Sequence, residues 1–309
     1  MTKDSGEKDT LKVYKTVMGN HARGFVCQRQ IDEITQNILP NLQEKKSDIG
    51  IIAPYNEQAN EIYKNVKNDE ILISTIHKFQ GREKGTMIMS TVEDEISPFV
   101  DDKNLLNVAV SRAINHFYII VNPNKINEHT NIGDLVNYIE YNNFEIIESD
   151  IYSIFDYLYK QYENEKLKIL KNSKKVSIYD SENLMYYQLT KILKENNYTD
   201  LDIIPHLPLK EIFKDLTKLN TEEYNFVTNT DSHVDFMIYN KITKRPILAV
   251  EVDGYYLHKE GTKQQERDIL KNGVFEKYHF PILRFKTNGS NEEKIILSKL
   301  KDILKKPTT

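Results

Sequence analysis

Short apolar runs alternate with segments of helical spacing between residues 49 and 121 of this 309-residue chain, and this alternation limits the folds it can adopt. The expected strands cover residues 49–53, 71–76, 86–91 and 116–121, and the expected helices cover 57–66 and 104–113. Strands that alternate with helices pack in layers around a largely parallel sheet. We therefore predict an α/β fold for this region, ending near Asn122-Pro123.

A polar loop, Gln80-Gly81-Arg82-Glu83, follows the second expected strand. A glycine beside polar side chains at the carboxyl end of a strand allows backbone N–H groups to approach a phosphate. Downstream, Arg112 is the one arginine on the otherwise apolar helix at 104–113. The sequence has no G-x-x-x-x-G-K-[ST] segment, and so it lacks the backbone cradle and the lysine of a phosphate loop.

Segments 49–58, 72–84 and 105–113 resemble motifs IV, V and VI of superfamily 1 helicases. The resemblance implies the second RecA-like lobe of such an enzyme. It implies nucleic-acid contacts from Tyr55, Thr75 and His77 and nucleotide contacts from Gln80, Glu83 and Arg112, with Gln58 as a further candidate. Arg112 would be the arginine finger, which stabilises charge on the transferring phosphoryl group. ATP would be shared with a first RecA-like lobe, in the same longer protein or in a separate chain.

Residues 232–240 and 246–254 form two alternating runs joined by a short polar turn. A hairpin centred on Thr243 places Asp235 across from Glu251 and His233 across from Asp253. The opposite face then carries the apolar side chains of Val234, Phe236, Val250 and Val252. Opposed like charges destabilise a sheet, and so carboxylates gathered on one face require a proton or a cation. Carboxylate oxygens are hard ligands that suit Mg²⁺ or Mn²⁺.

The hairpin belongs to a longer pattern: Val-Asp-Phe, Ala-Val-Glu-Val-Asp-Gly-x-x-x-His258, Gln265-x-x-Asp268-x-x-Lys271 and Pro281-Ile-Leu-Arg-Phe285. Over residues 176–290 this pattern resembles PD-(D/E)xK nucleases, in the branch that includes very-short-patch-repair endonucleases. The resemblance implies a restriction-endonuclease-like α/β/α domain that hydrolyses DNA phosphodiesters. It implies metal ligands from Glu182, Asp235, Glu251 and Asp253.

One position departs from the family pattern. The family lysine would fall at position 253, where this chain has Asp253. The general base is therefore open, and His258 is a candidate because an imidazole titrates near neutral pH. Lys263 or Lys271 could supply the displaced positive charge, although a solvent-facing helix stripe also explains Lys271 and its neighbours. A structural hairpin with solvated carboxylates is the alternative to a metal site.

We predict three regions: a helicase lobe at 1–123, a helical connector at 124–175 and a nuclease domain at 176–309. In the third region we expect helices at 181–195, 264–278 and 292–304, strands at 234–239, 247–253 and 282–285, and a loop containing Pro205 and Pro208. The remaining histidines, such as His206 and His279, are expected to be structural.

The formal net charge of −4 argues against a uniformly basic nucleic-acid surface, but it is compatible with a local basic groove. A single cysteine, Cys27, excludes an intrachain disulfide framework and a cysteine-rich zinc site. No apolar run approaches the ~18 residues of a membrane span, and we expect a cytoplasmic protein. The expected partner is DNA, and the combination of motor and nuclease suggests DNA repair or antiviral defence. A non-catalytic nucleic-acid-binding module and a subunit that completes an ATPase in trans are the alternatives.

Overall fold

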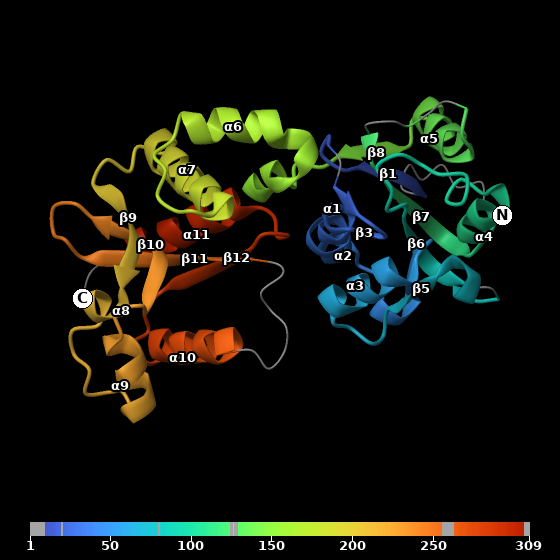
Figure 1. The fold of residues 1–309 in the computed structure, drawn as a ribbon. Coiled ribbons are helices and arrows are strands. Elements are labelled where there is room, and N and C mark those ends of the chain that lie inside the picture. The colour runs from blue at the N-terminus through green and yellow to red at the C-terminus, as the bar shows by residue number, and fades with distance from the viewer. Residues whose placement is uncertain are drawn as a thin grey trace. The chain divides into compact units, whose positions relative to one another are not determined.

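The chain divides into two compact units, Met1–Tyr152 and Ser153–Thr309, and each unit has its own apolar core (Figure 1). The computed structural model describes residues 10–19, 21–79, 81–123, 126, 129–254 and 263–305. Among these residues, no helix has both the length and the apolar character needed to cross a membrane.

A six-stranded parallel sheet forms the centre of the first unit. In spatial order its strands are β5 (Leu72–Thr75), β4 (Ile49–Ala53), β6 (Lys84–Ser90), β7 (Ala113–Val121), β1 (Leu11–Lys15) and β8 (Glu145–Glu148). The first four lie where the sequence predicts strands, and the prediction of a parallel α/β fold is confirmed. A small hairpin of β2 (Ala22–Arg23) and β3 (Val26–Cys27) lies outside this sheet.

Helices cover both faces of the first sheet because successive side chains of each strand point in opposite directions. On β6, Met87 and Met89 belong to one buried cluster, whereas Ile88 belongs to another. The Met87 cluster includes η3 (Ile76–Phe79), α4 (Lys103–Ser111) and α5 (Asn131–Tyr141). The Ile88 cluster includes α1 (Gln28–Asp32), the π-helical η1 (Glu33–Ile38), α2 (Leu39–Asn41) and α3 (Asn56–Val66).

Cys27 is buried immediately before α1. Its backbone N–H donates to Gln58 Oε1 at 2.9 Å, and burial raises the pKa of its thiol to about 12. The Gln58 amide also donates to Ser90 Oγ at 2.9 Å. Gln58 is itself fully buried, and so its side chain connects β3 to β6 rather than facing a base or a nucleotide.

The residues expected to form a helical connector, 124–175, are divided between the two units. In the first unit, α5 buries three apolar side chains and β8 pairs with β1, so that this unit continues to Tyr152. The second unit begins with η5 (Ile154–Leu158), η6 (Lys160–Tyr162) and α6 (Glu163–Lys171). These segments belong to the second unit because Ile154 and Phe155 lie in its core.

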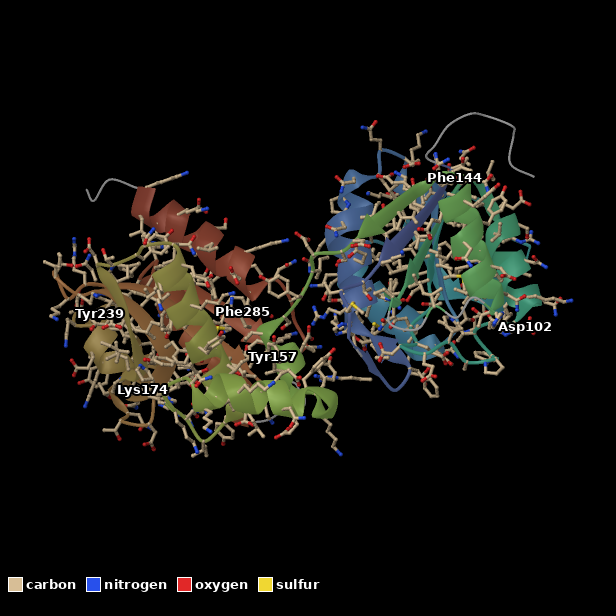
Figure 2. All side chains as sticks on the ribbon, turned by 90° about the horizontal axis from the view of Figure 1, so that it is seen from above. Asp102, Phe144, Tyr157, Lys174, Tyr239 and Phe285 are labelled. Carbon is tan, nitrogen blue, oxygen red and sulfur yellow. The ribbon has the colours of Figure 1, made fainter. Side chains whose placement is uncertain are left out.

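A four-stranded mixed sheet forms the centre of the second unit. In spatial order its strands are β12 (Ile282–Lys286), β11 (Pro246–Asp253), β10 (His233–Asn240) and β9 (Leu201–Pro208). Only the β11–β12 pair is parallel. One apolar cluster joins this sheet to α7 (Asp180–Glu195) and α11 (Glu292–Lys305), and it contains Phe285 with Tyr157 packed against it (Figure 2). The other joins it to α8 (Leu209–Ile212), α9 (Thr221–Thr228) and α10 (Lys263–Lys277).

The segment around Pro205 and Pro208 is strand β9 and not the expected loop. Proline lacks a backbone N–H, and it is therefore tolerated at the edge of a sheet and excluded from its centre. β9 is an edge strand that pairs only with β10. Its position explains how a segment with two prolines remains a strand.

Candidate functional site

The second unit contains a pocket of about 330 Å³ at one end of its sheet. Among the described residues that line it are six carboxylates, from Glu182, Asp231, Asp235, Glu251, Asp253 and Asp268, and two cationic side chains, from Arg267 and Lys271. All four metal ligands expected from the sequence are in this lining. The pocket therefore gathers an excess of negative charge from α7, β10, β11 and α10.

The β10–β11 hairpin has the predicted register, with Phe236 opposite Val250. The regular backbone pairing of β10 with β11 ends at Phe236 and Val250. Past this pair, the carboxylates of Asp235 and Glu251 accept hydrogen bonds from the opposite strand. The Asp235 N–H donates to Glu251 Oε1 at 3.3 Å, and the Val252 N–H donates to Asp235 Oδ2 at 2.7 Å. The two carboxylates therefore bridge the ends of the strands and lie side by side.

Two details of the predicted hairpin are wrong. His233 and Asp253 do not pair with each other, because the β10–β11 ladder ends at Phe236 and Val250. They pair only with the outer strands β9 and β12. Val234 packs in the cluster that includes α10, whereas Phe236 packs in the cluster that includes α7. On the neighbouring β9, His206 has φ +51°. This left-handed conformation interrupts the regular alternation of side chains at that level of the sheet.

Two cationic side chains contact the carboxylates of β11. Lys271 Nζ lies 2.8 Å from Glu251 Oε2 and donates to the His233 carbonyl oxygen at 2.8 Å. Arg284 Nη1 lies 3.2 Å from Asp253 Oδ1 and 3.8 Å from Glu251 Oε2. Lys271 thus occupies a place suited to the displaced family lysine. Arg284 was not foreseen, and the signal for it is its parallel pairing with Glu251 across β11 and β12.

The pKa values of two carboxyl groups in the pocket are raised, chiefly by burial. Burial raises the pKa of Glu251 to about 7, although the nearby Lys271 ammonium opposes this shift. Burial also raises the pKa of Asp235, and the Glu182 carboxylate adds to the increase. Burial penalises the charged form of both groups, and a bound cation would offset that penalty. Buried carboxylate oxygens are hard ligands, and this donor set fits Mg²⁺ or Mn²⁺.

Glu182 lies in the first turn of α7, and its side chain is 13% exposed. Its Oε2 is buried and accepts no hydrogen bond within the described part of the chain, while His206 Nε2 lies 3.5 Å away. A buried acceptor without a donor costs about 1–3 kcal/mol. This oxygen is therefore available to a cation or to a group that a cation holds.

Other expected residues lie apart from this arrangement. His258 lies outside the described residues, as do the side chains of Lys263 and Gln265. Asp268 lines the pocket, and its Oδ1 is 3.5 Å from Arg284 Nη1. His279 is exposed and does not line this pocket.

In the first unit, Arg112 directly follows α4, and its Nη1 lies 3.7 Å from Glu83 Oε1. Arg112 Nε is buried and has no hydrogen-bond partner among the described residues. Gln80 lies outside those residues, and Gly81 beside it has φ +82°, where glycine is favoured. Glu83 and Arg112, two of the three expected nucleotide contacts, therefore lie together.

The three expected nucleic-acid contacts differ in exposure. Thr75 is buried at the end of β5, whereas His77 is exposed. The Tyr55 ring is half-buried between Phe25 and Phe99, with ring centroids 4.5 Å and 5.6 Å away. His77 and Phe99 line a hollow of about 420 Å³. Tyr55 and His77 thus both lie beside Phe99, while Thr75 presents little surface.

Comparison with known protein families divides the chain in the same way. Residues 4–124 match the AAA_12 family, described as an AAA domain. Residues 174–303 match a family described as a protein of unknown function, DUF2726. The first match and the relatives below support a superfamily 1 helicase lobe in the first unit.

Three of the similar curated proteins are named as helicases or as a DNA-binding protein. An uncharacterized ATP-dependent helicase of Caenorhabditis elegans is 31% identical over 44% of this chain and 9% of its own length. The DNA replication ATP-dependent helicase/nuclease dna2 of Schizosaccharomyces pombe is 24% identical over 62% of this chain and 13% of its own length. The DNA-binding protein SMUBP-2 of Rattus norvegicus is 35% identical over 29% of this chain and 10% of its own length. The chain thus spans a small part of each relative.

Among solved structures, the HK97 bacteriophage large terminase aligns with 96% of this chain and 69% of its own, at 8% identity and a TM-score of 0.29. A TM-score this low does not indicate a shared fold.

Proposed function

We propose that this chain is the C-terminal part of a superfamily 1 DNA helicase–nuclease and that its second unit hydrolyses DNA phosphodiesters with Mg²⁺ or Mn²⁺. The observation that carries the proposal is the pocket in which Asp235, Glu251 and Asp253 meet Lys271 and Arg284. The relative named as a helicase/nuclease is consistent with a motor and a nuclease in one protein. The combination of the two activities would suit DNA repair or defence against foreign DNA.

Asp235 and Glu251 would hold the cation, with Asp253 and Glu182 completing the carboxylate set. A bound divalent cation polarises a phosphoryl group and lowers the pKa of a bound water. Lys271 holds the Glu251 carboxylate in place, and its ammonium lines the pocket, where it can donate to a phosphate oxygen. We propose His258 as the general base.

The test is cleavage of single- and double-stranded DNA with Mg²⁺ or Mn²⁺. Asp235→Ala and Glu251→Ala should each abolish the products, because each removes one of the two carboxylates proposed to hold the cation. Asp302→Ala is the matched control, since Asp302 is exposed on α11 and does not line the pocket. Equal products from the parent chain and both pocket variants would rule out the nuclease.

A second candidate function for this unit is nucleic-acid binding without cleavage. It is favoured by Asp253, which replaces the family lysine, and by the cations that already neutralise Glu251 and Asp253. In that case the chain would retain DNA in a mobility-shift experiment, and no divalent ion would produce cleavage. A DNA complex of equal affinity in the parent and in Glu251→Ala, without products, would establish this function.

For the first unit, we propose an ATPase half-site that acts with a first RecA-like lobe in the same protein or in a separate chain. Arg112 and Glu83 would approach the phosphates held by that lobe. The chain alone should then hydrolyse ATP poorly, and a phosphate-loop lobe added in trans should restore the activity. A full ATPase rate from the chain alone would exclude a half-site.

A further inference from the structure

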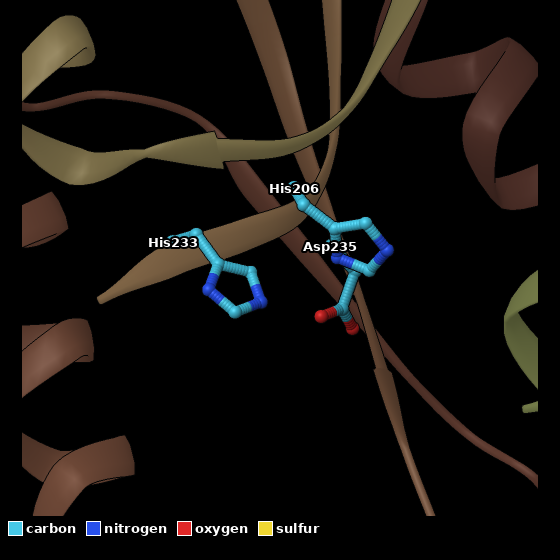
Figure 3. Close-up of side chains that lie close together, drawn as sticks. All are labelled: His206, His233 and Asp235. Atoms are coloured by element: carbon cyan, nitrogen blue, oxygen red, sulfur yellow. The ribbon is translucent and has the colours of Figure 1, made fainter. Parts of the chain in front are cut away.

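Three side chains on the adjacent strands β9 and β10 form a cluster that shares one residue, Asp235, with the carboxylate set. They belong to His206, His233 and Asp235, and Figure 3 shows them directed toward one another. Each contributes one atom able to ligate a metal, and these atoms all lie within 4.8 Å of one another. Typical ligand distances of about 2.0–2.2 Å would require only modest side-chain rotation from that starting point.

A second atom of each side chain is already held by the protein. His206 Nε2 lies 3.2 Å from the Val176 carbonyl oxygen, and His233 Nδ1 lies 3.1 Å from that of Asp231. Asp235 Oδ2 accepts from the Val252 N–H. When one ring nitrogen of a histidine donates to a carbonyl, the other is fixed as the unprotonated, ligating nitrogen. The remaining ring nitrogens and Asp235 Oδ1 are therefore oriented for an ion.

The protein's own cations contact the carboxylates of β11 and the backbone of His233. Lys271 Nζ contacts Glu251, and Arg284 Nη1 contacts Asp253. The histidine side has the buried Glu182 Oε2, which lies 3.5 Å from His206 Nε2 and accepts no hydrogen bond from any residue that the structure describes. Glu182 and Asp235 thus place negative charge beside the two imidazoles, and a bound divalent ion would offset that charge.

The backbone of His206 adds an independent observation. Its φ of +51° within a strand is uncommon for a residue with a side chain, and such conformations cost about 1–3 kcal/mol. With the backbone in this conformation, the centroid of the His206 ring lies 5.2 Å from that of the His233 ring. Strain of this kind gathers at functional sites, where the surrounding structure maintains it.

We propose that His206, His233 and Asp235 bind one divalent transition-metal ion of the class Mn²⁺, Co²⁺ or Zn²⁺. A mixed set of two imidazole nitrogens and one carboxylate oxygen can hold these ions, whereas Mg²⁺ prefers an all-oxygen site. The site shares Asp235 with the proposed nuclease, but it rests on binding chemistry and does not require DNA cleavage. It assigns a ligand role to two histidines, one of which the sequence suggested was structural.

The test is titration of the full chain with Co²⁺, followed by the visible absorption of the bound ion. His206→Asn and His233→Asn should each weaken Co²⁺ binding on the order of tenfold or more, since even loss of an outer partner costs 10–100-fold. His279→Asn is the matched control: His279 also has φ +51°, and it lies outside the pocket. Asparagine tolerates this backbone conformation, so the variants should fold. Equal Co²⁺ affinity in the parent and both pocket variants overturns the site.

A second measurement needs no substitution. Mn²⁺ bound to the parent chain should show ¹⁴N modulation in an electron spin-echo experiment, and bound Mn²⁺ without nitrogen coupling overturns the proposal. Failure of the nuclease is distinguishable from failure of this site. Histidine-dependent Co²⁺ binding without DNA cleavage retains the metal site and removes the nuclease. Mg²⁺-dependent cleavage with Co²⁺ affinity unchanged in the histidine variants retains the nuclease and rules out the histidine metal site.

Discussion

The first and second units both place charged side chains at the ends of sheet strands, but they differ in how much of the surrounding site they provide. In the first unit, Glu83 is 59% exposed, and the buried Nε–H of Arg112 has no hydrogen-bond partner among the residues that the structure describes. In the second, the Glu251 side chain is 6% exposed, and cations from α10 and β12 contact it. Burial with neutralising neighbours describes a site that one chain can complete, whereas exposed charges with unused donors describe a surface awaiting a ligand held elsewhere.

The largest expected effect is on ATP hydrolysis in the presence of a phosphate-loop lobe. Arg112→Ala should lower kcat at least about 10³-fold, because an arginine finger contributes about 10³–10⁵-fold to phosphoryl transfer. Phosphate release measures the rate. Arg245→Ala is the control, since Arg245 is exposed in the β10–β11 turn of the other unit. A rate for Arg112→Ala close to that of the parent would exclude Arg112 as an arginine finger and with it the proposed ATPase half-site.

The next effect is on DNA cleavage by the second unit. Lys271→Met should lower the rate about 10²–10³-fold, a loss typical of removing one charge-stabilising donor. Gel quantification of products measures it, with ATP hydrolysis in the first unit unchanged. Lys277→Met on the same helix is the matched control, because Lys277 contacts Glu223 and does not line the pocket. Equal losses from both lysine variants would point to damage to α10 and not to a role for Lys271.

A smaller effect is the pH dependence of Mg²⁺ binding. Glu251 has a pKa raised to about 7, so a proton occupies this ligand below that pH and competes with the cation. Affinity should therefore fall as pH falls below 7, by up to about tenfold per pH unit for one competing proton. Isothermal titration calorimetry between about pH 5.5 and 8 measures this. Glu251→Gln should weaken binding and remove this slope, and a parent affinity independent of pH would exclude Glu251 as a ligand.

The smallest effect concerns stability and tests whether the units are independent. Asn220 caps α9, where its side chain accepts from the Glu223 N–H at 2.9 Å. Asn220→Ala should lower the free energy of unfolding of the second unit by about 1 kcal/mol. Thermal unfolding followed by circular dichroism measures the change, with exposed Asn225→Ala on the same helix as control. A shift in the transition of the first unit as well would show that the units unfold together.

Much of both sheets could be predicted because buried strands have a strong apolar pattern. β4 has the predicted bounds, and β10 and β11 differ from prediction by a residue or so at each end. β9 was missed because its prolines argue for a loop unless the strand is known to lie at an edge. The continuation of the first unit through β8 was missed because only pairing with β1, far away in the sequence, makes that short segment a strand.

The site shows the same division between local and distant information. The register that brings Asp235 to Glu251 follows from the alternation within one hairpin. Arg284 lies on β12 and His206 on β9, and the sequence of the β10–β11 hairpin does not reveal that these strands flank it. His206 also depends on a left-handed backbone conformation at a non-glycine residue, which composition and spacing do not reveal.

The burial of Cys27 has a practical consequence for labelling. Only thiolates react readily with maleimides, and a thiol with a pKa of about 12 inside the core remains unreactive at neutral pH. A cysteine introduced on the surface would therefore be the one reactive thiol of the chain, without removal of the natural residue. Ile269 is 64% exposed on α10, the helix that carries Lys271. A fluorophore attached there would report directly on the arrival of an ion or a nucleic acid at the pocket.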